Sequence, residues 1–85
     1  MNVITTRVRR RFSPSRLKSA RERRGLTQRE MSEAIVRDIR QYQRIEAGHM
    51  RPTPDQLAEL ADALEVTIDS LYAIPDEEGS TRSDG

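Results

Sequence analysis

The amino-acid sequence predicts an all-α fold, a compact bundle of about five short helices. Three observations support this class. Only 34% of the 85 residues are hydrophobic, so the core is small and suits short helices better than a sheet. In the central part of the chain these residues recur every three or four positions, as on the buried face of a helix. Capping residues and glycines between these stretches mark where each helix begins and ends.

A first helix is expected over residues 14–24. Ser13 is a favourable N-cap, and Pro14 fits the first helical position, where no backbone hydrogen bond is lost. Leu17 and Ala20 give this helix a buried face.

A second helix is expected to begin at about Gln28. Gly25 can take the left-handed conformation that ends the preceding helix, and Thr27 with Glu30 forms a capping box. The buried stripe of this helix consists of Met31, Ala34 and Ile35. A segment of only two turns is not stable alone, so packing must hold it in place.

A third helix follows after a short turn. Asp38 offers its N-cap, Tyr42 and Ile45 form its buried face, and Gly48 supplies the next left-handed stop. Helix, turn and helix are therefore the central unit of the chain.

Two further helices complete the predicted bundle. Thr53 and Gln56 form a second capping box, with Pro54 at the first helical position. The apolar stripe of this fourth helix consists of Leu57, Leu60, Ala61 and Leu64. Thr67 caps a last short helix that ends before Pro75. The residues that it holds inside are Ile68, Leu71 and Tyr72.

The segments on either side of the expected domain, residues 13–73, differ from it in composition. Residues 1–12 have no helix signal, and at most residues 3–8 could form a short strand, so we expect a mobile basic arm. Residues 74–85 have the composition of a disordered acidic tail.

The composition excludes several functional classes. The chain has no cysteine and one histidine, so neither a disulfide nor a metal site is expected. No apolar run approaches the ~20 residues that span a bilayer, and no secretory signal is visible, so we expect a cytoplasmic, nucleoid-associated protein. Since there is no nucleophile with a base, no metal cluster and no glycine-rich phosphate loop, we expect neither an enzyme nor a cofactor.

The net charge of +1 hides a strong polarity along the chain. Residues 1–24 carry nine Arg or Lys and one Glu, whereas residues 52–85 carry one Arg and nine Asp or Glu. This asymmetry suggests a basic face for a polyanion and an acidic rear. An Arg-rich disordered tail beside an ordinary solvated surface would give the same balance, and charge alone does not separate the two.

The central motif resembles the Cro/repressor-type, XRE-like helix-turn-helix family of bacteria and phages, over roughly residues 16–72 and without a gap. The resemblance implies a lambda-repressor-like DNA-binding domain. The matching positions are Arg21, Gly25, Leu26, Thr27, Gln28, Met31, Ile35, Ile45, Glu46, Ala47, Gly48, Pro52, Leu60, Ala61, Asp62, Ala63 and Leu64.

Two residues of the turn depart from the family pattern. Val36 stands where the family usually has a glycine, and Arg37 where it usually has a small buried apolar residue. A β-branched residue with positive φ is an outlier, so we expect the helix to run on through Val36 and the turn to be rebuilt around Arg37.

Base-reading residues are expected on the third helix, on the face opposite Tyr42 and Ile45. They are Ile39, Arg40, Gln43 and Arg44. Arginine suits guanine, glutamine suits adenine, and an aliphatic side chain suits the thymine methyl. The resemblance implies that these positions contact base edges in the major groove. The alternative is a polar solvated face, which any amphipathic helix has.

Phosphate contacts are expected around this helix. Gln28 stands at a helix N-terminus, where free amides favour an anion, and the resemblance implies that it clamps a phosphate. The alternative is a first-turn glutamine without a partner. His49 and Arg51 follow the third helix and by resemblance touch further phosphates, although an ordinary loop histidine fits nearly as well. The arginines of the arm could track the backbone or enter a groove: Arg7, Arg9, Arg10 and Arg11.

The resemblance also implies a structural ion pair. Glu46 ends the third helix, where an acid is electrostatically unfavourable, and its family counterpart pairs with an arginine that corresponds to Arg21. We therefore interpret Glu46 as structural and not as a catalytic acid.

The leading functional hypothesis is a sequence-specific DNA-binding transcriptional regulator, expected to be a repressor, that reads the major groove with residues 39–47. One short helix reads few base pairs, so a homodimer on two half-sites is expected. Its contact residues could be Leu71, Tyr72 and Ile74, which could equally pack on the monomer core. The alternative function is a protein-interaction module, such as an antitoxin or an adaptor.

Overall fold

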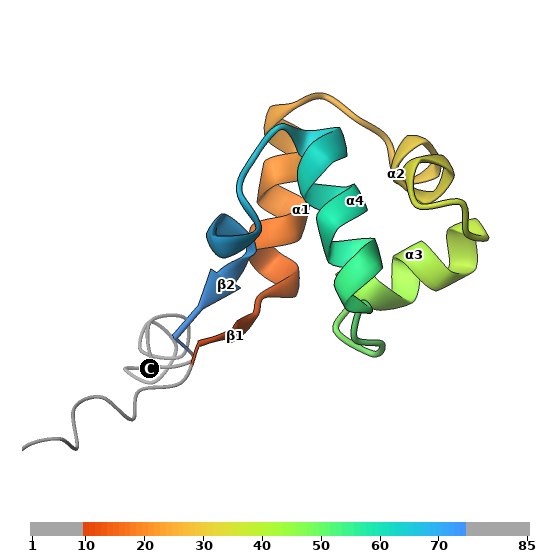
Figure 1. Cartoon of the computed structure of the whole chain (residues 1–85). Coiled ribbons are helices and arrows are strands. Elements are labelled where there is room, and N and C mark those ends of the chain that lie inside the picture. The colour runs from red at the N-terminus through yellow and green to blue at the C-terminus, as the bar shows by residue number, and fades with distance from the viewer. Residues whose placement is uncertain (1–9, 75–85) are drawn as a thin grey trace, which may run out of the picture.

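The computed structural model describes residues 10–74, and its helices follow the predicted order (Figure 1). Ser13, Thr27, Asp38, Thr53 and Thr67 all serve as the expected N-caps. The elements are β1 (Arg11–Phe12), α1 (Pro14–Arg23), α2 (Gln28–Ala34), α3 (Ile39–Glu46), α4 (Pro54–Leu64), η2 (Ile68–Leu71) and β2 (Tyr72–Ala73). The mainly helical fold class is therefore confirmed, with four α-helices and one 3₁₀ turn among residues 10–74.

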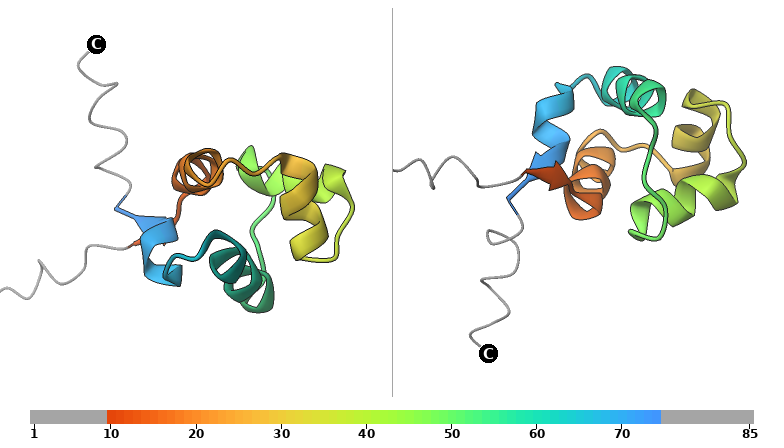
Figure 2. Two further views of the ribbon diagram at one scale, coloured as in Figure 1. Left: turned by 90° about the horizontal axis from the view of Figure 1, so that it is seen from above. Right: turned by 60° about the horizontal axis from the view of Figure 1, so that its bottom comes forward.

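One apolar core joins all the helices. Its fully buried side chains come from every helix: Leu17, Met31, Tyr42, Ile45, Leu60, Leu64 and Leu71. α3 packs on both α1 and α2, while α4 packs on α2 and η2. Figure 2 shows that α2 and α3 lie at one end of the molecule and the two strands at the other. The short helices thus gain their stability from one another.

A small antiparallel sheet closes the domain and corrects the expectation of helices alone. Arg11 pairs with Ala73 and Phe12 with Tyr72, and the rings of Phe12 and Tyr72 meet edge to face with centroids 6.4 Å apart. Arg11 and Phe12 were expected in a mobile arm, and Tyr72 in the last helix. Both expectations are wrong. The sequence did not reveal the strands, because a strand of two residues has no alternating pattern and the two strands lie at opposite ends of the domain's sequence.

All four helices end in the same type of turn, with one residue of positive φ. That residue is Gly25 (φ 71°), Val36 (φ 55°), Gly48 (φ 86°) or Glu65 (φ 59°). In each turn the backbone N–H groups of this residue and of the next one bond to carbonyls in the last turn of the helix. This is the Schellman arrangement, which satisfies carbonyls that a helix end would otherwise leave free.

The prediction that the second helix runs on through Val36 is wrong. α2 ends at Ala34, and the N–H of Val36 donates to the Glu33 carbonyl at 3.1 Å. The N–H of Arg37 donates to the Ser32 carbonyl at 2.9 Å and closes the turn. Because α3 must begin directly afterwards to bury its own apolar face, tertiary packing overrides the local preference of valine.

Candidate nucleic-acid interface

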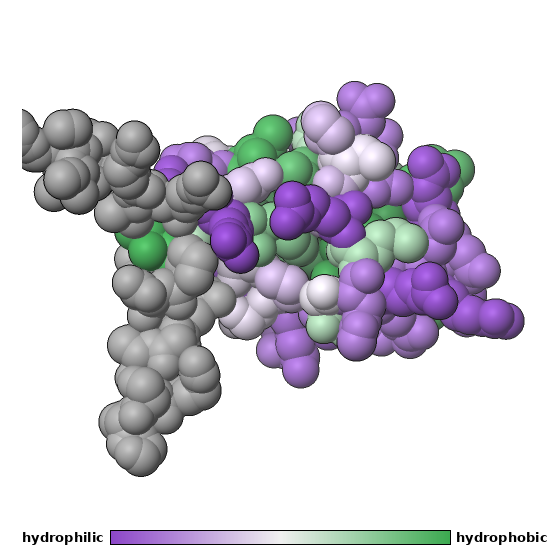
Figure 3. Space-filling view, turned by 90° about the horizontal axis from the view of Figure 1, so that it is seen from below, coloured by the Kyte–Doolittle hydropathy of each residue, from purple (hydrophilic) through white to green (hydrophobic). Residues whose placement is uncertain are grey.

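The outer face of α3 presents the residues that the sequence predicts for base reading. Arg40, Gln43 and Arg44 are exposed and Ile39 is partly exposed. On the inner face Tyr42 and Ile45 are fully buried, as their spacing along a helix requires. Figure 3 shows the side of the molecule on which α3 lies, where hydrophilic side chains cover most of the described surface. The side chains of the outer face can therefore form hydrogen bonds with a ligand while the inner face of the helix stays packed in the core.

A buried carboxylate holds α3 against the two helices before it. Glu46 Oε2 accepts from Arg21 Nε at 2.6 Å and from the Tyr42 hydroxyl at 2.8 Å. Its Oε1 accepts from Gln28 Nε2 at 2.7 Å and from Arg21 Nη2 at 3.2 Å. The Glu46 side chain is only 4% exposed and that of Arg21 12%. The ion pair expected from the resemblance is thus the centre of a four-residue network, which we call the Glu46 network.

The electrostatics of this network follow from burial and its hydrogen bonds. Burial opposes the ionisation of Glu46, but the hydrogen bonds from Arg21, Gln28 and Tyr42 outweigh it and lower the pKa of the carboxyl group. The hydrogen bond to Glu46 raises the pKa of Arg21. Burial, followed by the hydrogen bond to Glu46, raises the pKa of Tyr42. At neutral pH the site therefore holds a carboxylate, a guanidinium and a neutral phenol.

The lowered pKa of Glu46 predicts a specific dependence of stability on pH. The unfolded chain titrates Glu46 near the ordinary value of 4.5, and the folded chain titrates it lower. The stability from Glu46 is therefore complete above pH 4.5 and declines as the pH falls through the folded pKa. Urea unfolding of the wild type and of Glu46→Gln between pH 2 and 7 should show a difference that shrinks in acid. A constant difference would contradict the prediction.

Gln28 connects the Glu46 network to the outer face of α3. Its side-chain oxygen accepts from Gln43 Nε2 at 3.1 Å, while its amide nitrogen donates to Glu46. The alternative of a first-turn glutamine without a partner is therefore wrong. The spacing of residues did not reveal this link, because Gln28 and Gln43 belong to different helices. The orientation of one predicted base reader is thus tied to a buried ion pair.

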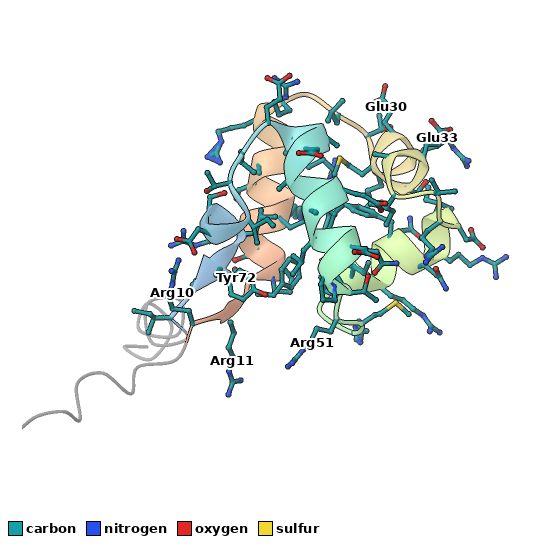
Figure 4. The ribbon with its side chains drawn as sticks, viewed as in Figure 1. Arg10, Arg11, Glu30, Glu33, Arg51 and Tyr72 are labelled. Carbon is teal, nitrogen blue, oxygen red and sulfur yellow. The ribbon has the colours of Figure 1, made fainter. Side chains whose placement is uncertain are left out.

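A basic hollow lies where the two strands meet the loop that follows α3. It encloses about 340 Å³, and it is lined by Arg10, Arg11, Phe12, Arg51 and Tyr72. In Figure 4, Arg11 and Arg51 point the same way, toward the lower side of the molecule, whereas Glu30 and Glu33 point away from that side. No described residue forms an ion pair with Arg11 or Arg51. Their charges are therefore available to an anion.

Arg10 behaves differently from its neighbour. Its Nη1 lies 3.0 Å from Asp69 Oδ1, and its Nη2 donates to the Asp69 carbonyl at 3.1 Å. This pair is exposed, so it contributes little to stability but directs the side chain toward η2. Arg7 and Arg9 lie outside the described residues. Of the two arm arginines that the structure describes, Arg11 thus lies beside Arg51 with its charge unpaired, whereas Arg10 is paired with Asp69.

His49 and the residues expected at a dimer contact occupy different surroundings. His49 is exposed directly after Gly48, where its N–H donates to the Arg44 carbonyl at 2.8 Å. Leu71 is 0% exposed, so its assignment to a dimer surface is wrong, and it packs in the monomer core instead. Tyr72 and Ile74 remain partly exposed.

Within residues 10–74 the acidic and histidine side chains do not gather into a group that could hold a metal ion. None of the helices in this range is long and apolar enough to cross a membrane.

Comparison with known proteins shows the family to which the helix-turn-helix motif belongs. A family model described as Helix-turn-helix matches residues 17–71. The chain is also 38% identical over 56 residues to the cryptic phage CTXphi transcriptional repressor RstR of Vibrio cholerae serotype O1. This match covers 66% of the chain and 50% of RstR, so the chain spans about half the length of that relative. No solved structure matches the chain.

Proposed function

Because the chain belongs to the helix-turn-helix family of DNA-binding transcriptional regulators, we propose that it is a repressor that reads the major groove with α3. One observation carries the proposal. The outer face of α3 holds two exposed arginines and a glutamine, and the inner face of the same helix is fixed by the Glu46 network. A rigid helix with polar side chains on one face suits direct reading of base edges. The similarity to RstR, itself a transcriptional repressor, supports repression.

Arginine, glutamine and isoleucine on this face define what the helix reads. Arg40 and Arg44 each donate two hydrogen bonds to a guanine, and Ile39 packs on a thymine methyl. Gln43 pairs with an adenine, and its hydrogen bond to Gln28 sets the direction of its amide. Through its second amide hydrogen Gln28 also donates to a phosphate at the N-terminus of α2.

Further phosphates are held on either side of α3. Arg11 and Arg51 approach one part of the DNA backbone from the basic hollow. His49 contacts a phosphate of the DNA strand that lies just beyond the end of α3. Arg7, Arg9 and Arg10 add sequence-independent attraction. A second copy of the chain binds the neighbouring half-site, about 34 Å away along the duplex, with Tyr72 and Ile74 near the contact.

Selection from a random pool of DNA duplexes tests this function. We expect a short sequence to be enriched, and its affinity to fall steeply with salt because bound phosphates release counterions. Removal of residues 1–9 should flatten that salt slope on every sequence while the selected sequence stays preferred. If the pool yields no preferred sequence and binding shows no salt dependence, the chain is a protein-interaction module such as an antitoxin or an adaptor.

A further inference from the structure

Val36 combines two features that are unfavourable for a valine. The residue is 77% exposed, and its backbone has a φ of 55°. A left-handed conformation brings Cβ of a non-glycine residue close to the following carbonyl, and a β-branched side chain makes the crowding worse. At the corresponding positions after α1 and α3, Gly25 and Gly48 form the same turn without this strain.

The valine side chain does not stabilise the turn that contains it. Both closing hydrogen bonds are made by backbone atoms, from Val36 to Glu33 and from Arg37 to Ser32. The guanidinium of Arg37 donates to the Val36 carbonyl at 3.3 Å, which again uses the backbone. Since about three-quarters of the residue is exposed, packing within the described domain does little to offset the strain. Backbone strain of this kind clusters at binding sites and active sites, which points to a contact outside the monomer.

The position of Val36 indicates what that function is. It lies two residues before Asp38, the N-cap of α3, and so at the N-terminal end of the proposed reading helix. In helix-turn-helix docking, this end of the helix lies nearest the base edges. Among the groups that base pairs present in the major groove, the apolar one is the thymine methyl. An exposed aliphatic side chain at this position can pack against the thymine methyl group. It cannot form hydrogen bonds with the polar groups of the base edges.

We propose that Val36 is a specificity-determining residue that packs against the methyl group of a thymine in the bound site. The proposal rests on the proposed function, because it requires α3 to enter the major groove. Together with the partly exposed Ile39, Val36 then makes an apolar edge beside the hydrogen-bonding face of Arg40 and Gln43.

A thermodynamic cycle between one protein substitution and one DNA substitution tests the contact. Duplexes with the selected sequence are prepared with each thymine replaced in turn by deoxyuridine, which removes only the methyl group. We expect wild type to lose about three- to fivefold in affinity at one such position, as for one apolar group no longer buried. Val36→Gly should not distinguish thymine from deoxyuridine there. The same variant should melt a few degrees higher than wild type, because the strain is gone.

Glu65→Gly is the matched control. Among residues 10–74, Glu65 is the other non-glycine residue with positive φ, at the end of α4, so this change also relieves backbone strain. The ion pair that it removes, between Glu65 and Arg24 at 3.2 Å, is exposed and contributes little to stability. It should raise the melting temperature and keep the full discrimination between thymine and deoxyuridine. Its lost negative charge strengthens binding to both duplexes alike and cancels in their ratio.

Two results would overturn the inference. Val36→Gly with undiminished discrimination at every position would mean that the side chain touches no thymine methyl. If Val36→Gly lowered the affinity for thymine and deoxyuridine duplexes equally, Val36 would instead contact a sugar or stiffen the turn. Arg40→Ala keeps these results separate from the proposed function, since its effect on base preference persists if only the role of Val36 is wrong.

Discussion

Replacement of Glu46 by glutamine is expected to lower the free energy of unfolding by about 3–5 kcal/mol, as for other buried ion pairs that lose one partner. The Arg21 side chain is 12% exposed, and after the change its remaining carboxylate partner would be Glu22, at 3.9 Å and more exposed to solvent. The new amide would also present a donor to groups that are themselves donors, Arg21, Gln28 and the Tyr42 hydroxyl. The resulting stability would be marginal for a domain of this size.

Urea unfolding followed by circular dichroism measures this change, with Glu59→Gln as the matched control. Glu59 is an exposed glutamate on α4, so the control removes the same charge and should change stability by less than about 0.5 kcal/mol. Combined with Arg21→Met, Glu46→Gln should show a coupling above about 0.5 kcal/mol. Additive effects would mean that the two side chains do not interact. A fully stable Glu46→Gln with a changed base preference would place Glu46 in the groove instead.

The second large effect concerns DNA recognition. Arg40→Ala and Arg44→Ala are each expected to weaken binding to the selected sequence by about 1–3 kcal/mol, because each removes a bidentate contact to one base pair. Both side chains are exposed, so the fold should be unaffected. Each variant should lose its preference at one base pair and keep it elsewhere.

Fluorescence anisotropy with the selected duplex and its single-base variants measures both affinity and preference. Arg23→Ala is the control, since Arg23 is an exposed arginine at the far end of α1 from the basic hollow. It should weaken binding to all duplexes by a similar, small amount. If Arg40→Ala and Arg44→Ala discriminated among the duplexes as wild type does, α3 would not be the reading element.

Features encoded by neighbouring residues could be predicted from the sequence. Each N-cap, such as Thr27 with Glu30, depends on residues within one helical turn, so its chemistry is legible in the chain. The left-handed turns at Gly25 and Gly48 were predictable for the same reason. The conformation of Val36 was not, because packing of the next helix decides it against local preference. The pairing of Arg11 with Ala73 and the bond between Gln28 and Gln43 join distant segments, on which local patterns carry no information.

The pairing of β1 with β2 has a consequence for how the chain is made. β1 is among the first described residues to leave the ribosome, yet its partner Tyr72–Ala73 is the last element of the domain. Until the end of the domain has emerged, Phe12 lacks the ring of Tyr72. The N–H of Ser13 likewise lacks the Leu71 carbonyl, to which it donates at 2.8 Å in the folded protein. The helices of the core are complete by then, and their contacts are mostly closer in sequence. We therefore expect the strand pair to form last during synthesis. Because few residues hold it together, we also expect it to open before the helices when the folded protein fluctuates.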